Sequence, residues 1–153
     1  MDMSISFLMS GTTLFKSLNH EEAEIVEKKL VVTNRKAGQM IYKEGEHAKS
    51  VCFVAEGELA VIKKDESGKE HQVATLKRGA AVGEMAVIDG IVRSASIKAL
   101  TDVTIVIFKR EGFDALLEEH PLIGIKLLKE LARSLSLSLR KTSDELTKLS
   151  TTG

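Results

Sequence analysis

The order of apolar and polar residues divides the chain into a helical beginning, a strand-rich middle and a helical end. Between residues 14 and 30, apolar side chains recur at the spacing of an amphipathic helix. Asn19 is followed three residues later by Glu22, a capping box that predicts the beginning of a second short helix. We therefore expect N-terminal helices over residues 1–30.

The middle of the chain, residues 31–110, is typical of short β-strands. Its runs rich in valine and isoleucine are GQMIY, VCFVAEG, ELAVIKK, HQVATL, SASIKAL and DVTIVIF. Glycines separate them at close to the spacing of about 8–12 residues expected of a small barrel or sandwich. Gly68 suits the turn of a hairpin in KKDESGKEHQV, and Gly57 suits another tight reversal. We therefore expect antiparallel strands here.

The last part of the chain, residues 111–149, returns to helical spacing. Phe113 and Leu116 predict a short helix, and Pro121 suits the first position of a long one. We expect the apolar stripe of the long helix to cover the barrel as far as about Leu131. Beyond that point the stripe resembles a coiled-coil seam and favours a homodimer through this helix; its members are Leu135, Leu139, Thr142, Leu146 and Leu149.

Composition indicates one globular domain that spans residues 1–153. Hydrophobic residues make up 43% and charged residues 29% of the chain. The formal net charge is zero, without the basic excess typical of nucleic-acid binders. No run approaches the roughly 18 apolar residues of a membrane span. Cys52 is the single cysteine, so no internal disulfide can form, and a cytoplasmic location is expected.

The stretch GEMAVIDGIVRSAS, residues 83–96, combines groups that suit a phosphate with a hydroxyl nearby. Gly83 lets the backbone approach a ligand closely. Met85, Ala86 and Val87 suit a single helical turn, whose free N–H groups favour a phosphate. Arg93 offers a planar cationic fork that matches two phosphate oxygens.

The remaining polar residues of this stretch suit other parts of such a ligand. Glu84, when ionised, can only accept hydrogen bonds and would repel a phosphate, so its natural partner is a sugar hydroxyl. The Ser94 hydroxyl can donate a hydrogen bond to the phosphate. A ligand with one phosphate, one nearby hydroxyl and an apolar base would satisfy all of these groups.

These residues resemble the phosphate-binding cassette of cyclic-nucleotide-binding domains, the family of catabolite-activator-type regulators and protein-kinase regulatory subunits. The resemblance extends from LFKSL (14–18) through YKEGE (42–46) and FVAEGELAV (53–61) to the helix after EEHP. It implies a mainly β fold with flanking α-helices: an antiparallel β-roll or jelly-roll barrel with N-terminal helices and a long C-terminal helix. The barrel would occupy residues 31–110, and the C-terminal helices residues 111–149.

The resemblance also implies a role for individual residues. Glu84 would bind the ribose 2′-hydroxyl, and Arg93 would neutralise the cyclic phosphate beside backbone amides near residues 86 and 87. Val73 and Leu76 fall where the family lines the base pocket. Ser138 falls where a hydroxyl of the long helix touches the adenine amino group. The lid over the base would be aliphatic, formed by residue 128 or residue 131, both leucines.

These observations favour a non-catalytic regulatory sensor that binds a 3′,5′-cyclic nucleotide, cAMP in preference to cGMP, without a prosthetic group. The chain reaches Gly153 without room for a DNA-reading domain, so the C-terminal helix would signal to a separate downstream protein, or the sequence would be part of a longer one.

Two alternatives remain. In a degenerate protein-interaction module, Glu84 and Arg93 would form a buried ion pair in place of a ligand site. A cupin-like metal enzyme would need clustered histidines. The four histidines of the chain lack metal-ligand spacing, and no catalytic constellation stands out, so we expect no enzyme and no metal site.

Overall fold

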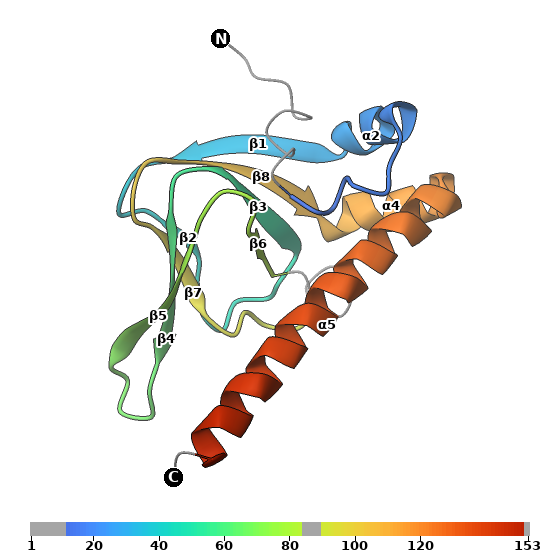
Figure 1. Cartoon of the computed structure of the whole chain (residues 1–153). Helices are drawn as coiled ribbons and strands as arrows, with labels where there is room; N and C mark the ends of the chain where they lie inside the picture. The colour runs from blue at the N-terminus through green and yellow to red at the C-terminus, as the bar shows by residue number, and fades with distance from the viewer. Residues whose placement is uncertain (1–11, 84–89, 152–153) are drawn as a thin grey trace.

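The computed structural model describes residues 12–83 and 90–151. Glu84, Met85, Ala86 and Val87, to which the sequence assigns ligand contacts, lie outside the described residues. Within these ranges, one helix precedes the strands and two helices follow them (Figure 1). The elements are α2 (His20–Glu27), β1 (Leu30–Arg35), β2 (Met40–Tyr42), β3 (Ser50–Glu56), β4 (Leu59–Lys64), β5 (Glu70–Leu76), β6 (Ala81–Val82), β7 (Ser96–Ala99), β8 (Val103–Lys109), α4 (Arg110–Glu119) and α5 (Pro121–Thr151).

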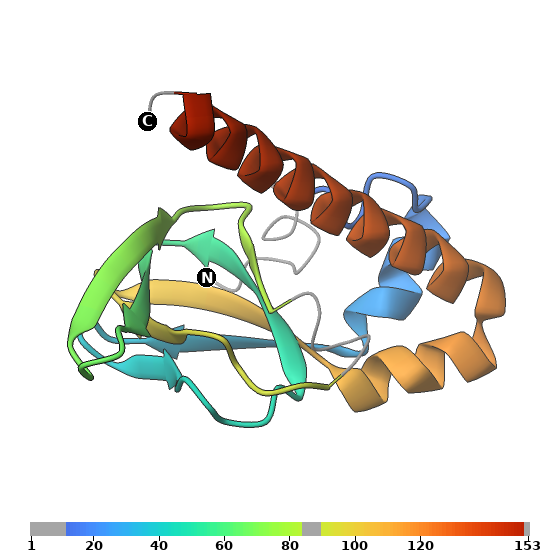
Figure 2. The same cartoon turned by 90° about the horizontal axis from the view of Figure 1, so that it is seen from below.

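The described strands form two four-stranded antiparallel sheets, with the orders β1-β8-β3-β6 and β2-β7-β4-β5. β8 lies between β1 and β3, so the first and last strands of the barrel segment pair with each other in one sheet. The long helix α5 leaves α4 and runs past the roll toward the side of the β4–β5 hairpin (Figures 1 and 2). This confirms the predicted antiparallel β-roll with flanking helices and a long C-terminal helix.

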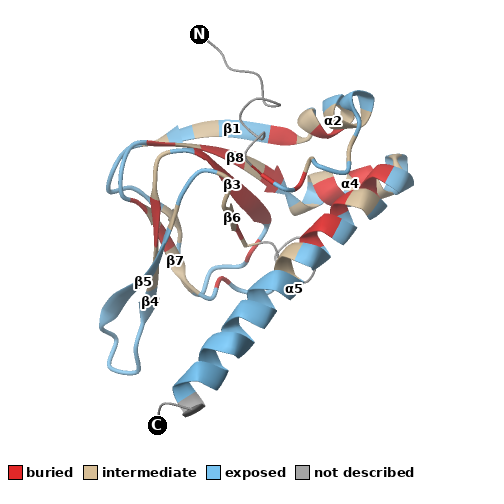
Figure 3. Ribbon diagram, in the orientation of Figure 1, coloured by how far each residue is buried: buried red, intermediate tan, exposed pale blue. Residues whose placement is uncertain are grey.

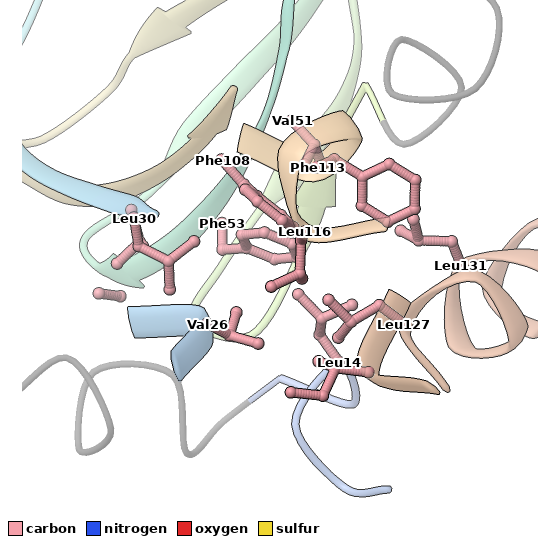
Figure 4. Close-up of a cluster of buried hydrophobic side chains, with 13 residues drawn as sticks. Leu14, Val26, Leu30, Val51, Phe53, Phe108, Phe113, Leu116, Leu127 and Leu131 are labelled. Atoms are coloured by element: carbon pink, nitrogen blue, oxygen red, sulfur yellow. The ribbon is translucent and has the colours of Figure 1, made fainter. Parts of the chain in front are cut away.

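The strand β3 supplies two cores because successive side chains of a strand point to opposite faces. Val51 and Phe53 face a core between the sheet and the helices, which also contains Val26, Phe113 and Leu127 (Figure 4). The intervening residues face a second core inside the roll, made of Cys52, Val54, Leu59, Val82, Ile97, Ala99, Val103 and Ile105. Burial on both faces explains why VCFVA reads as an unbroken apolar run.

Within residues 12–30, the helix α2 is shorter than the sequence predicts. The capping box is confirmed, since the Asn19 N–H donates to Glu22 Oε1 (3.0 Å) and the Glu22 N–H donates to Asn19 Oδ1 (2.9 Å). However, residues 12–17 form turns, and α2 ends at Glu27. Leu30 already pairs with Phe108 as the first residue of β1. The β-branched run that follows Leu30 completes a sheet, which overrides the helical spacing.

The predicted turns at Gly57 and Gly68 and the predicted beginning of the long C-terminal helix are confirmed. Gly57 has a φ of 88°, and a Cβ there would lie 2.5 Å from the Asp102 carbonyl oxygen, so the β3–β4 reversal requires a glycine. The hairpin turn at Gly68 also has a positive φ. Pro121 is the first residue of α5 and directly follows His120, the C-cap of α4.

Candidate functional site

A cavity of about 460 Å³ opens beside the inner face of the sheet β2-β7-β4-β5. Its volume lies in the range of about 300–1,000 Å³ that is usual for small-molecule sites. Most of its wall is apolar, and the polar side chains come from two consecutive residues of the predicted cassette. The wall consists of Ala48, Val61, Leu76, Ala81, Val82, Gly83, Ile91, Val92, Arg93, Ser94, Ala95 and Ile97.

The backbone of Arg93 is fixed by a short antiparallel pairing with the segment before β3. The Arg93 N–H donates to the Glu46 carbonyl (2.7 Å), and the Gly45 N–H donates to the Arg93 carbonyl (2.9 Å). His47 and Val92 form an isolated antiparallel bridge beside them. Arg93 therefore projects from a fixed strand-like position into the cavity wall.

The guanidinium of Arg93 is buried but leaves part of its hydrogen-bonding capacity unused. Arg93 is 7% exposed. Its Nη2 donates to the Ser50 carbonyl oxygen (2.6 Å), and its Cζ lies 3.7 Å from the centroid of the Tyr42 ring. Its Nε and Nη1 are buried and have no hydrogen-bond partner among the described residues.

Leaving such a cation incompletely satisfied is costly. Because guanidinium stays protonated throughout the physiological pH range, Nε and Nη1 remain charged donors. An anion that enters the cavity would satisfy them.

Gly83 lies directly against this guanidinium. Its φ is 79°, and a Cβ at this position would collide with Arg93 Nη1. The glycine thus serves both the backbone conformation and the close approach of the arginine. The sequence predicted such an approach to a ligand, and the structure adds an approach to the arginine itself.

The other predicted site residues lie at different places. Leu76 and Ser94 line the cavity together with Gly83 and Arg93. Val73, which was expected at the base pocket, is instead exposed and is not among the lining residues. The pairing of Val61 with Ala74 and of Ile62 with Gln72 leaves Val73 as the extra residue of a β-bulge. The position that the resemblance implied for this side chain is therefore not at the cavity wall in this structure.

The α5 residues that were expected to contact the base do not line the cavity in this structure. Ser138 is exposed, does not line the cavity, and accepts a hydrogen bond from Thr142 Oγ1 through its carbonyl oxygen (3.0 Å). Neither leucine proposed as a lid lines the cavity. Leu131 belongs to the helical core, where it packs in the same cluster as Phe113 (Figure 4). Leu128 is partly exposed at the helix surface.

The sequence did not assign a role to Tyr42 or Ser50, the two residues that hold the Arg93 guanidinium. The Tyr42 hydroxyl and Ser50 Oγ lie 2.8 Å apart. Burial raises the pKa of the Tyr42 phenol, and the nearby Cys52 thiol contributes to this shift. Tyr42 is the single tyrosine of the chain, which was a usable signal. Ser50 gave none, because its main-chain carbonyl makes the contact.

No group of three or more His, Cys, Asp or Glu side chains arranged to hold a metal ion occurs within residues 12–83 and 90–151. In that part of the chain no helix has both the length and the apolarity needed to cross a membrane.

Comparison with known proteins agrees with this geometry. The sequence profile of the cyclic nucleotide-binding domain matches residues 32–120. The chain is 31% identical over 127 residues to the cyclic AMP receptor protein of Thermus thermophilus, which covers 83% of this chain and 59% of that protein. It is also 36% identical over 96 residues to a lysophospholipase of Phaeosphaeria nodorum, which covers 63% of this chain but 6% of that protein.

A solved structure extends the likeness over nearly the whole chain. The crystal structure of a cyclic nucleotide-binding domain from Methylobacillus flagellatus superposes with a TM-score of 0.82 at 25% identity and covers 95% of this chain and 81% of that one. The sequence match spans the strands and α4, and the structural match adds α5. The chain belongs to the cyclic nucleotide-binding domain family.

Proposed function

We propose that this chain binds a 3′,5′-cyclic nucleotide and acts as a non-catalytic regulatory sensor in the cytoplasm. The observation that carries the proposal is the guanidinium of Arg93, buried at the wall of the 460 Å³ cavity with Nε and Nη1 unpartnered among the described residues. A cyclic phosphate carries one negative charge and two exposed oxygens, so it matches what the guanidinium lacks. The apolar remainder of the wall suits a nucleobase.

The finer assignments follow the predicted cassette. Glu84 binds the ribose 2′-hydroxyl, and the amides of residues 85–87 together with Ser94 bind the phosphate. Leu76 lies against the base. The ligand is cAMP in preference to cGMP, because the sequence places a hydroxyl, that of Ser138, where it can meet the adenine amino group.

Signalling runs through α5 to a separate protein. Ser138 is exposed in this structure, so its contact with the base requires a movement of the helix. A ligand can cause such a movement when it contacts the helix differently in its two arrangements. The exposed leucines of α5 beyond Leu131 offer a surface for a homodimer or a downstream partner.

Isothermal titration calorimetry with cAMP and cGMP tests the binding. We expect stoichiometric heat with the wild-type chain and a loss of roughly 2–5 kcal/mol in binding free energy for Arg93→Ala, because truncation leaves a buried phosphate unpaired. Arg93→Gln, which keeps one donor for the Ser50 carbonyl, should also lose most of the affinity. Arg133→Gln is the matched control, since that side chain is 71% exposed on α5.

The same titration separates the alternatives. Absence of heat with either nucleotide, in protein shown to carry no co-purified ligand, would replace the sensor with a protein-interaction module. Stoichiometric metal in the purified protein would favour a cupin-like enzyme. Equal affinities of wild type and Arg93→Gln would contradict the role of the arginine.

A further inference from the structure

The Arg93 guanidinium is held from outside the cassette, by β2 and by the first residue of β3. The Tyr42 ring covers one face of the guanidinium, with Cζ 3.7 Å from the ring centroid. The Ser50 carbonyl accepts from Nη2 at 2.6 Å, and Ser50 Oγ lies 3.5 Å from the same nitrogen. The Tyr42 hydroxyl and Ser50 Oγ, 2.8 Å apart, join the two holding residues to each other.

This arrangement fixes the plane of the guanidinium before any ligand arrives. A long arginine side chain has many rotamers, and ordering them on binding weakens affinity. Here the ring sets the plane, and the Ser50 carbonyl sets the rotation within it. Gly83 leaves room for Nη1 on its side, because a Cβ there would collide with it. The nitrogens left over, Nε and Nη1, are those without partners among the described residues.

We infer that Tyr42 is a positioning residue for phosphate recognition, acting through Arg93; this inference rests on the proposed function. The Tyr42 ring occupies one face of the guanidinium, so a nucleobase cannot stack on that face. The N–H bonds of Nε and Nη1, which have no partner among the described residues, lie in the guanidinium plane, so an anion that satisfies them approaches the edge. An approach along the edge favours an anion with two oxygens, such as a cyclic phosphodiester, because its oxygens can accept hydrogen bonds there. It disfavours an aromatic ring, which would have to stack on a face of the guanidinium. The hydroxyl of Tyr42 contributes less than its ring, because it acts on the guanidinium through Ser50.

A double-mutant cycle tests the inference, with cAMP and cGMP affinities measured for Tyr42→Leu, Arg93→Lys and the double variant. Lysine keeps the charge but has no plane for the ring to orient. We expect Tyr42→Leu to weaken binding about 10-fold when Arg93 is present and less than about 2-fold when it is replaced, as the size of a partly desolvated cation–π contact suggests. Equal losses in both backgrounds, or no loss with Arg93 present, would overturn it.

Two further variants separate positioning from folding. Tyr42→Phe keeps the ring and removes the hydroxyl, so it should fold and bind within about 3-fold of wild type, the scale of one neutral hydrogen bond. Ile41→Ala removes a neighbouring side chain that packs on the core inside the roll, so it should lower thermal stability without coupling to Arg93. A Tyr42→Phe loss as large as that of Tyr42→Leu would contradict the role of the ring.

A measurement without nucleotide keeps this inference distinct from the proposed function. In ¹⁵N spectra of the ligand-free chain, the Arg93 guanidinium should show restricted rotation in wild type and Tyr42→Phe and faster rotation in Tyr42→Leu. If the wild-type chain binds neither nucleotide, the proposed function fails, and the spectra still decide whether Tyr42 fixes the guanidinium. Rotation that is equally fast in wild type and Tyr42→Leu would overturn the inference.

Discussion

The two halves of α5 carry the same kind of leucine pattern but meet different surroundings. In the first half, Ile123, Leu127 and Leu131 are buried against α4 and the core, and Leu127 is fully buried. The second half of α5 is exposed (Figure 3), and its leucines face solvent. Leu139, for example, is 72% exposed. An apolar stripe predicts that one face of a helix can be buried. In this chain the core extends along only the first half of α5, so only that half of the stripe is buried within the described structure.

The largest expected effect separates the halves by stability. Leu127→Ala should lower the free energy of unfolding by about 2–5 kcal/mol, because it opens a cavity in a packed core. Leu139→Ala, the matched change in the exposed half, should alter it by less than about 0.5 kcal/mol. Denaturant unfolding at low protein concentration measures both. Similar losses for the two variants would mean that the second half is also covered.

Hydrogen exchange sharpens the comparison along the helix. At low protein concentration, amides of residues 137–149 should exchange faster than those of residues 123–131 by on the order of 10-fold or more, because tertiary packing protects the first half alone. If protection of the second half rises with protein concentration, a second copy of the chain covers it. Equal protection at every dilution would contradict the difference between the halves.

A smaller effect concerns the ion pair that ties the first half to α2. Lys126 Nζ lies 2.8 Å from Glu22 Oε1. The hydrogen bond from the Asn19 backbone, followed by the one from Lys126, lowers the pKa of Glu22 below 4.5. A depressed pKa stabilises the fold above pH 4.5, and this contribution is lost as the pH falls through the folded-state pKa.

Glu22→Gln should therefore lower stability at pH 7, by less than Leu127→Ala does, and should flatten the dependence of stability on pH below 4.5. Glu21→Gln is the control, because Glu21 is an exposed neighbour in the same helical turn. Urea unfolding between pH 3 and pH 7 gives both curves. If the free energy of unfolding of Glu22→Gln depended on pH below 4.5 as that of the wild type does, the Glu22 carboxylate would not contribute to acid stability.

The smallest expected effect is a difference in the rate of thiol labelling between the exposed half of α5 and the interior of the roll. Burial raises the pKa of the Cys52 thiol to about 12, although the charges of Arg93 and Arg35 lower it in part. At pH 8 a thiol reagent should therefore label Leu139→Cys at position 139 and leave Cys52 unmodified until the protein unfolds. Labelling of both positions at similar rates in the native protein would contradict the closed interior.

The sequence predicted the fold well where local signals and the sheet agree. Asn19 and Pro121 mark helix beginnings that the structure confirms, and Gly57 marks a reversal that requires a positive φ. The prediction from sequence was wrong where pairing with a distant strand determines the secondary structure. Leu30 fits a helical stripe but pairs with Phe108 in β1. Such a partner lies far away in sequence, so periodicity cannot identify it.

Of the predicted cassette, Gly83, Arg93 and Ser94 line one cavity, whereas the residues that hold the Arg93 side chain were not predicted from the sequence. Arg93 could be identified because its charge stands in an apolar stretch. Tyr42 and Ser50, which hold its guanidinium, come from a distant segment, and one of them acts through its main chain. Val73, which the resemblance placed at the base pocket, is exposed at a bulge in β5, and this irregularity could not be read from the sequence.

The ³¹P spectrum of cAMP tests the central claim most directly, because the phosphorus nucleus reports on the group that Arg93 would bind. The account predicts that adding the wild-type chain shifts the phosphorus resonance and that the same concentration of Arg93→Gln leaves it close to its free position. An unshifted resonance with the wild-type chain, or an equal shift with both proteins, would contradict the account.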